Sequence, residues 1–463
     1  MRPYQTSFPM PPMDFFRPIP IQSNHLMVVL SKTLDWDLYQ AIAEIHRDKM
    51  IISARGQQPH YRTLCGAVVV RILKSCDFRT AEDLIRNYLP ARYLCNLQNT
   101  EWTPDHNTIW EFEKMLGKEG LREINDSVLL LAADLGYADP RGLCADTTVQ
   151  EAFIPHPTEV GHMNSFMKSC KENLETLYSK SKGLGKKIAD KMKNIFSEIG
   201  EKVRSHRLFA KTKEARLELN RELLKKSLEL NAQLEKLLIN ADLKKNRIVG
   251  SGKRALNNLA ESYNNFSRML PEITHWIQKG KVVKGKIVSL FNPEFKAINR
   301  GKIGKAIEFG LKWGINQVRG GYVAIYMHKM MMACDADYAV LAVEEHIRLF
   351  GKPPRDFGFD RAAWSELHKI EIKNKGVKNI AIAPKGQSDW DVGPRVKDRM
   401  IRERAQVEGK IGTMKTNYGF NKSKAKTNTG VQMSALRAAL CFNLKRLAKD
   451  LASESLSIQA ASA

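Results

Sequence analysis

The prediction of the fold starts from one segment, Gly142-Leu143-Cys144-Ala145-Asp146-Thr147-Thr148-Val149. It follows a turn signal, Asp139-Pro140-Arg141-Gly142, and begins with a short apolar run. Such a run next to turn residues indicates a buried strand, and here the strand ends at an acid, Asp146. We therefore expect a sheet to begin at this point, with a carboxylate at the end of its first strand.

The residues after about 282 predict the rest of the sheet. Gly320 and Gly321 mark a hairpin between two of its strands. The expected elements are strands at 286–291, 306–318 and 321–326, a helix at 338–349, a strand into 357–360, a helix at 362–373, a strand at 377–383, and a last helix at 395–415. This order predicts an α/β domain with a mixed sheet, interrupted after its first strand.

Helical periodicity dominates the chain before that sheet. Over residues 36–135 apolar side chains recur three and four positions apart, as at Leu64, Val68 and Ile72. Thr80 and Thr108 each stand where a side-chain hydroxyl can cap the start of a helix. The pattern predicts a compact all-α domain.

A long, charged and nearly proline-free segment, residues 164–281, separates the first strand from the others. One predicted helix face carries five leucines at steps of 4, 7, 4 and 3 residues: Leu219, Leu223, Leu230, Leu234 and Leu237. This spacing predicts a helical hairpin or a coiled coil. Residues 165–254 hold 23 Lys and Arg against 11 Asp and Glu, which is half of the excess charge of the chain. The segment is therefore either a solvated helix surface or an arm that faces DNA or a protein partner.

The predicted domains are a Pro-rich arm, an N-terminal helical domain, a sheet domain in two pieces, a basic helical insertion and a flexible tail. Their boundaries, in that order, are 1–30, 31–138, 139–163 with 282–450, 164–281, and 451–463.

The net charge of the chain limits the class of partner. Its 74 Lys and Arg exceed its 50 Asp and Glu by 24, so its surface attracts polyanions. Nucleic acid is the leading partner, and ribosome association or an anionic membrane surface are the alternatives. No run reaches the roughly 18 apolar residues of a membrane helix, and the seven cysteines lack zinc-ligand spacing. We expect a cytoplasmic protein with no membrane partner, whose cysteines are reduced core thiols.

Three acids stand at strand ends or on the last helix of the predicted sheet domain: Asp146, Asp360 and Glu408. Mg²⁺ prefers oxygen ligands and keeps open positions for phosphate, so carboxylates from separate elements can form a cage for two ions. Two such ions stabilise both the attacking and the leaving oxygen when a phosphodiester is cut. Spacing alone cannot select these three among the 50 acids of the chain.

Around Glu408 the sequence reads Arg404-x3-Glu408-x6-Lys415, with Ile401 three residues before Arg404. This pattern resembles the Tyr-x2-Arg-x3-Glu-x6-Lys signature of a superfamily of bacterial insertion-sequence transposases of the DDE type, with Ile401 at the tyrosine position. The resemblance implies that the helical domain binds DNA and that the sheet domain is catalytic. Three further segments resemble the family: Phe359-Asp360-Arg361-Ala362-Ala363-Trp364-Ser365 at the second acid, 145–152 with 157–159 at the first acid, and 102–109 with Phe112 in the helical domain. The resemblance covers residues 40–160 and 285–450 and leaves the basic helical segment as an insertion.

This resemblance implies an RNase H-like catalytic core in which Asp146, Asp360 and Glu408 hold two Mg²⁺ or Mn²⁺ ions. It also implies the reaction: water cuts DNA at the terminal inverted repeats of a mobile element, and the freed 3′-OH attacks target DNA. Two ends must be cut and joined together, so a homodimer or a higher assembly on double-stranded DNA is expected.

Basic side chains near the three acids are the candidate DNA contacts. They are Arg300, Lys302, Arg361, Arg404 and Lys415. Arg404 lies one turn before Glu408 and Lys415 about two turns after it, so both can hold a phosphate from the same helix face. The alternative for these two is a surface ion pair beside Glu408. The basic segments 281–330 and 395–426 form the expected DNA channel, whose affinity falls as salt rises.

Two other functions fit the same residues. The first is an RNase H-like nuclease or resolvase that cuts DNA without strand transfer. The second is a domesticated DNA-binding protein in which the three acids are only structural. Formation of joined DNA products separates the first from a transposase, and the effect of replacing the acids separates the second.

Overall fold

The computed structural model describes residues 21–49, 59–180, 186–242, 248–302, 305–330, 333–384, 386 and 392–462. The chain divides into two compact units. The first takes residues 1–139, 320–324 and 436–463, and the second takes residues 140–319 and 325–435.

The first unit is built from helices. They are α1 (Leu26–Thr33), α2 (Trp36–Asp48), α3 (Tyr61–Lys74), α4 (Phe78–Asn87), α5 (Leu89–Leu94), α6 (His106–Asp134) and the second half of α14 (Asn428–Ser462). The helical nature of residues 31–138 agrees with the periodicity of the sequence. The expected arm 1–30 differs, because α1 begins at Leu26, and residues 1–20 lie outside the described part.

Carboxylates determine where three of these helices begin. Asp35, Asp77 and Asp105 each accept a hydrogen bond from the backbone N–H three residues later. We expected Thr80 and Thr108 to cap helices, and this was wrong by about one turn. In each case the N–H of the threonine is itself bound by the aspartate three positions earlier.

The C-terminal helix α14 was not predicted. It includes residues 451–462, where we expected a flexible tail. Within the first unit a buried carboxylate holds the second half of α14. Glu113, 1% exposed, accepts hydrogen bonds from Arg71 Nη1 at 2.6 Å and from Arg437 Nη1 at 2.5 Å.

The second unit contains a mixed sheet. Its strands are β1 (Asp139–Glu151), β2 (Lys296–Lys302), β3 (Lys305–Arg319), β4 (Val323–Tyr326), β5 (Asp356–Gly358) and β6 (Asn379–Ala381). The strand order is β2-β3-β1-β5-β6, and β4 pairs with β3. β1 pairs in parallel with β5, β5 in parallel with β6, and β2 antiparallel with β3. Gly320 and Gly321, both with positive φ, form the turn between β3 and β4, as expected from the sequence.

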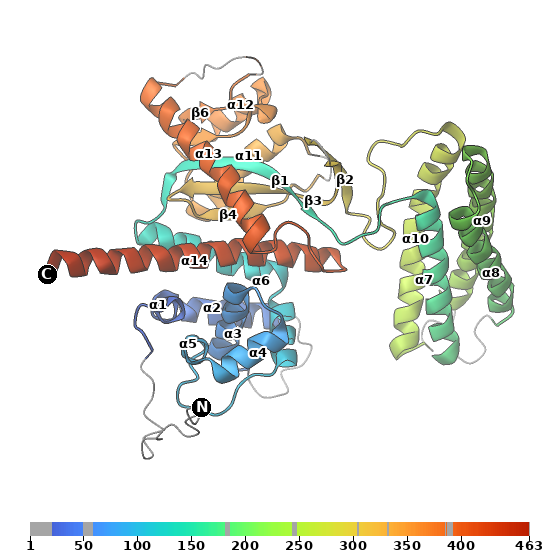
Figure 1. The fold of residues 1–463 in the computed structure, drawn as a ribbon, viewed down its shortest axis with the longest axis horizontal. Coiled ribbons are helices and arrows are strands. Elements are labelled where there is room, and N and C mark those ends of the chain that lie inside the picture. Colours follow the sequence, from blue (N-terminus) through green and yellow to red (C-terminus); the bar gives the residue numbers. More distant parts are fainter. Residues whose placement is uncertain are drawn as a thin grey trace, which may run out of the picture. The chain divides into compact units, whose positions relative to one another are not determined.

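Helices pack on both faces of this sheet (Figure 1). On one face, α11 (Asp335–Phe350) and α12 (Glu366–Asn374) share a core with Leu143 and Phe357 of the strands. The other face lies under α13 (Pro394–Asn417), where a Cβ on Gly358 would meet Cys144 Sγ and Met400 Cε. Successive side chains of a strand point to opposite faces. In β1, Leu143 therefore faces α11 and Cys144 faces α13.

The strand expected at 286–291 is absent from the structure, and β2 begins only at Lys296. Ile287 and Leu290 of this run are buried in the core that helix α10 (Gly250–Lys279) shares, whereas Phe291 is exposed. Side chains of α10 bind two backbone groups of the run. The N–H of Ile287 donates to Glu272 Oε2 at 3.0 Å, and the carbonyl of Leu290 accepts from Asn265 Nδ2 at 2.9 Å.

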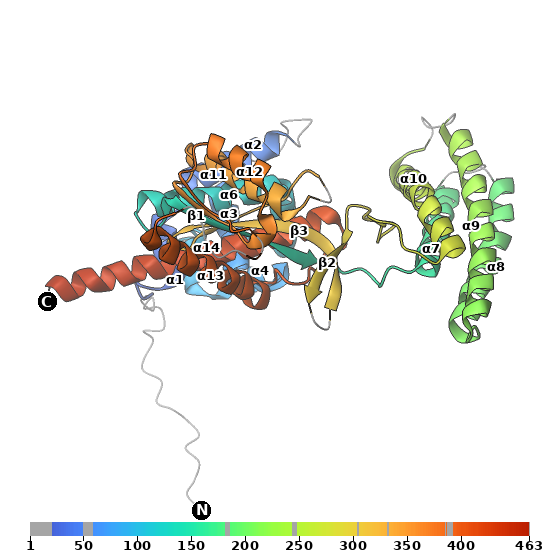
Figure 2. The ribbon, with the colours of Figure 1, turned by 90° about the horizontal axis from the view of Figure 1, so that it is seen from above.

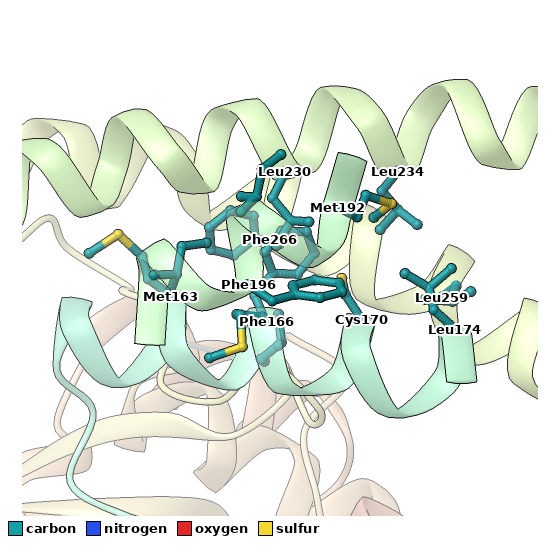
Figure 3. Close-up of a cluster of buried hydrophobic side chains, with 14 of the residues drawn as sticks. Met163, Phe166, Cys170, Leu174, Met192, Phe196, Leu230, Leu234, Leu259 and Phe266 are labelled. Atoms are coloured by element: carbon teal, nitrogen blue, oxygen red, sulfur yellow. The ribbon is translucent and has the colours of Figure 1, made fainter. Parts of the chain in front are cut away.

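The insertion after β1 is a bundle of α7 (Glu159–Lys180), α8 (Lys186–Leu208), α9 (Lys213–Asp242) and α10, which lie side by side in Figures 1 and 2. Four helices replace the expected hairpin or coiled coil, and they begin at Glu159 instead of residue 164. The bundle has a hydrophobic core of its own (Figure 3), in which the rings of Phe166 and Phe266 stack at 3.9 Å. Leu223, Leu230, Leu234 and Leu237 are buried, as their spacing predicted.

All seven cysteines are free. Five are buried, as expected of core thiols, whereas Cys76 is half-buried and Cys334 is exposed. Among the helices of the described residues, none is long and apolar enough to cross a membrane.

Candidate functional site beside strands β1 and β5

Two of the candidate acids follow the paired segments of neighbouring strands. Leu143 pairs with Phe357 and Cys144 with Gly358 in parallel. Asp146 comes two residues after Cys144 in β1, and Asp360 comes two residues after Gly358, where β5 has ended. Asp146 lies within β1, which continues to Glu151, instead of at the strand end that we expected.

Strand alternation also assigns a face to the two acids. Cys144 and Gly358 lie on the face covered by α13. Asp146 and Asp360 are each two residues later, so a strict period of two would direct both toward that face. Their charges also act on, or respond to, groups of the opposite core: Asp146 acts on Tyr326, and Asp335 of α11 acts on Asp360. The backbone stays extended up to Asp360, whose Oδ1 accepts the N–H of Ala362 at 3.0 Å and begins the short helix η2 (Arg361–Ala363). Asp360 is therefore within electrostatic reach of both Arg404 of α13 and Asp335 of α11.

Helix α13 is fixed to the sheet by a buried ion network. Asp356, at the start of β5, is 2% exposed and accepts hydrogen bonds from Arg319 Nη2 at 3.0 Å and Arg399 Nη2 at 2.5 Å. Glu403 of α13 accepts from Arg319 Nε at 2.5 Å. The next residue, Arg404, is half-buried, and its positive charge acts on the carboxyl of Asp360. The network thus holds α13 so that Arg404 lies near Asp360.

A fourth acid, Asp335, lies at this site. It is in the first turn of α11, where its Oδ1 accepts the hydroxyl of Thr147 at 2.8 Å and pairs with Lys312 Nζ at 2.8 Å. Burial raises the pKa of Asp360, and the negative charge of Asp335 raises it further. Backbone N–H groups and Arg404 oppose these two effects. The negative charges of Asp360 and Asp335 therefore lie close together in a partly buried region, where the ionised form of Asp360 is disfavoured.

Asp335 was not among the acids selected from the sequence. Its signal was the pair Asp335 and Asp337 in the first turn of a helix, which sequence reasoning assigns to helix capping. Asp337 does have that role, since its Oδ2 accepts the backbone N–H of Cys334 at 2.7 Å. Asp335 is connected with the candidate site by the hydrogen bond from Thr147, next to Asp146, and by its charge, which acts on Asp360.

Glu408 lies on α13, one turn after Arg404, and its side chain is exposed. Within the described part of the chain, no group of three or more His, Cys, Asp or Glu side chains is arranged to hold a metal ion. The structure thus relates Asp146 to Asp360 through strand register, and it relates Glu408 to them only through the helix that carries it.

The candidate DNA contacts lie in several elements. Arg361 is exposed in η2, directly after Asp360, and Lys415 is half-buried near the end of α13. Arg300 and Lys302 belong to β2, but their side chains lie outside the described part of the structure. Arg361 directly follows Asp360 in the chain, and the charge of Arg404 acts on Asp360.

Comparison with known proteins gives one match. Residues 18–115 match the family model described as Transposase domain (DUF772), which supports a transposase family and an enzyme that acts on DNA. No curated protein and no solved structure matches the chain. The matched residues belong to the first unit, whereas the candidate acids belong to the second.

Proposed function

We propose that this chain is a DNA transposase of the DDE type, in which Asp146, Asp360 and Glu408 bind the catalytic divalent ions. The observation that carries the proposal is the parallel pairing of β1 and β5, because Asp146 and Asp360 each follow its last paired residues by two positions. The sheet order supports an RNase H-like core, because a mixed sheet with parallel β1, β5 and β6 surrounds the acids. The match of residues 18–115 supports the transposase class independently.

The donor set fits Mg²⁺ or Mn²⁺. All three side chains are carboxylates, which hard divalent ions prefer. Asp360 carries a raised pKa because of burial and the charge of Asp335, and a divalent cation would offset that accumulated negative charge. When bound, two such ions supply Lewis-acid polarisation of the phosphodiester and lower the pKa of the attacking water.

The residues of the chain have separate parts in this proposal. Arg404 and Arg361 flank the acids and can hold phosphate oxygens, which positions the DNA strand. Asp356 and its two arginines position α13, and through it Glu408. Asp335 is a positioning residue, because its bonds to Thr147 and Lys312 connect α11 with β1 and β3.

The helical first unit is proposed to bind the terminal inverted repeats of the element. Cutting and joining two ends implies a homodimer or a higher assembly on double-stranded DNA. The net charge of +24 supports binding through phosphates, which sets affinity but does not read sequence.

The test uses the full chain, labelled DNA that ends in the inverted repeats flanking its gene, a target plasmid, and Mg²⁺ or Mn²⁺. We expect nicked ends and joined products, both abolished by chelation of the metal. Asp146→Asn, Asp360→Asn and Glu408→Gln should bind end DNA as the wild type does and neither cut nor join it. Asp398→Asn, which changes an exposed acid on the same helix, is the matched control and should retain activity.

Each alternative function has its own result in this assay. Nicked ends without joined products, sensitive to the same three substitutions, would identify a nuclease or resolvase. DNA binding by the wild type with no cutting under either metal would identify a DNA-binding protein. Cutting that survives all three substitutions would overturn the assignment of the acids.

A further inference from the structure

The helical bundle contains a cavity of about 720 Å³ that the proposed chemistry does not use. It lies at the end of the bundle where α8 leads into α9, α7 begins and α10 ends. Its volume is within the range of about 300–1,000 Å³ that is usual for pockets of small organic ligands. All of its lining residues belong to the described part of the insertion.

One side of α9 provides the polar lining of the cavity. Lys213, Arg216 and Asn220 recur three and four positions apart and so share one helix face. Asn220 is 3% exposed, and its Oδ1 has no hydrogen-bond partner among the described residues. A buried amide group that lines a cavity without a partner is the feature expected where a ligand completes the hydrogen bonding.

The cavity also has a cationic rim. Arg207 of α8 and Arg216 of α9 both lower the pKa of the neighbouring His206, after the larger effect of its burial, so their guanidinium groups lie close to that ring. Among the lining residues, all of them described, the one acid is Glu159, and its Oε1 binds Lys286 Nζ at 2.5 Å. The unneutralised charge at the rim is therefore positive and suits an anionic group.

The remaining wall is apolar and includes an aromatic ring. Trp276 and Ile277 of α10 and Leu217 of α9 line it. A flat ring can stack on an indole, and a purine or pyrimidine can present both donors and acceptors to an amide such as that of Asn220. A flat polar ring joined to an anion matches all three parts of the lining.

We propose that this cavity binds a nucleotide, with the base between Trp276 and Asn220 and the phosphate at Arg207 and Arg216. The nucleotide can come from two sources. One is an unpaired nucleotide of a DNA strand, and this source rests on the proposed transposase function. The other is a free nucleoside monophosphate, which does not depend on that function.

The test measures binding by the full chain in the presence of EDTA, so that DNA cutting is not needed. The probes are a short duplex with one bulged nucleotide, the same duplex fully paired, and free dTMP or dAMP. The variants are Asn220→Leu, Trp276→Leu and Arg207→Gln. Arg204→Gln, an exposed arginine on the same helix that does not line the cavity, is the matched control.

Trp276→Leu removes the ring on which the base would stack, so its affinity for the favoured probe should fall by about 5- to 150-fold. Asn220→Leu should also bind more weakly, yet melt at the same or a higher temperature, because it removes an unpaired polar group from the interior. A merely structural Asn220 would instead lower the melting temperature when replaced. If Trp276→Leu fails to fold, Asn220→Leu and Arg207→Gln still decide the result.

Two outcomes support the proposal and separate the sources. Preference for the bulged duplex, lost in the variants and retained in Arg204→Gln, identifies the unpaired DNA nucleotide. Saturable binding of dTMP or dAMP with the same variant pattern, without preference for the bulge, identifies the free nucleotide. If folded Asn220→Leu and Arg207→Gln bind every probe as Arg204→Gln does, the proposal is overturned, whatever the fate of the catalytic assignment.

Discussion

Replacement of Asp356 by Asn should loosen helix α13 from the sheet. The Asp356 side chain is 2% exposed and accepts hydrogen bonds from Arg319 Nη2, Arg399 Nη2 and Asn379 Nδ2 at 3.0, 2.5 and 2.7 Å. Asn has nearly the same size but no charge. Two guanidinium groups would therefore lose a charged partner, and Arg319 would keep Glu403.

The magnitude follows from burial. Removal of one member of a buried ion pair costs about 3–5 kcal/mol, and the lower end applies because the Arg399 side chain is 40% exposed. The lost contacts join α13 to the sheet, so the cost should appear as local opening of this helix. A change of about 3 kcal/mol raises the opened population on the order of 100-fold.

The thiol of Cys144 reports this opening. It is 1% exposed on the face below α13, and burial raises its pKa to about 12, so it should react slowly with thiol reagents. In Asp356→Asn its labelling, followed by peptide mass spectrometry, should be faster on the order of 100-fold. Cys65 of the first unit should label as before. Asp398→Asn is the control, and equal labelling of Cys144 in the two variants would refute the anchoring role.

Three further predictions concern single positions. Burial and Asp335 raise the pKa of Asp360, so its ionised form lowers the stability of the metal-free protein. Asp360→Asn should therefore melt above the wild type at neutral pH, and the difference should vanish as pH falls below the ordinary aspartate pKa of about 3.9; an unchanged melting temperature at neutral pH would contradict this. A Cβ at Gly310 would lie 2.0 Å from the Gln150 carbonyl oxygen, so Gly310→Ala should fail to give soluble protein. Gly200→Ala, with open space around it in α8, should be neutral or stabilising by up to about 1 kcal/mol in thermal melting. Glu113→Gln should lower the free energy of unfolding of the first unit by about 3–5 kcal/mol, because two arginines lose a buried carboxylate; hydrogen exchange of α6 would measure it, and unchanged protection would contradict this.

The two strand acids could be selected from the sequence because both follow short apolar runs that become neighbouring strands. Family resemblance chose them among many acids, and strand register then relates them in space. Asp335 could not be selected, because an acid in the first turn of a helix has a sufficient local explanation. Its link to the site is a long-range hydrogen bond with Thr147, which local pattern does not contain.

Apolar runs predict that a segment is buried more reliably than they predict which strand or helix covers it. The runs at 143–145 and 287–290 look alike, yet the first pairs in a sheet and the second packs on α10. The difference lies in Glu272 and Asn265, which satisfy the backbone of the second run from a helix. In the same way, the leucine spacing of α9 predicted a buried face but not that three helices would cover it. Long-range partners of this kind decide which of two locally equivalent structures forms.

The sheet domain should fold without the bundle, because backbone hydrogen bonds within the sheet domain hold the end of β1, where the chain leaves for the bundle. Glu151 exchanges backbone hydrogen bonds with Asn421 and Ser423, and the N–H of Ala152 donates to the carbonyl of Phe309. The bundle has a separate core, which includes Ile287 and Leu290. A deletion that kept these two side chains would expose them to solvent, so the cut should fall between Pro157 and Asn292.

A short Gly-Ser linker can join those two positions, since Pro157 and Phe291 line the same small cavity. Asn292 must stay, because its side chain binds the backbone of Lys426 and Asn428. The deletion removes 28 Lys and Arg but only 14 Asp and Glu, more than half of the net charge of +24. We expect a cooperative melting transition to remain, while affinity for end DNA falls and its dependence on salt becomes less steep. A deletion variant that binds, cuts and joins DNA like the full chain would show that the bundle has no part in handling DNA, and a variant without a melting transition would show that the sheet needs it to fold.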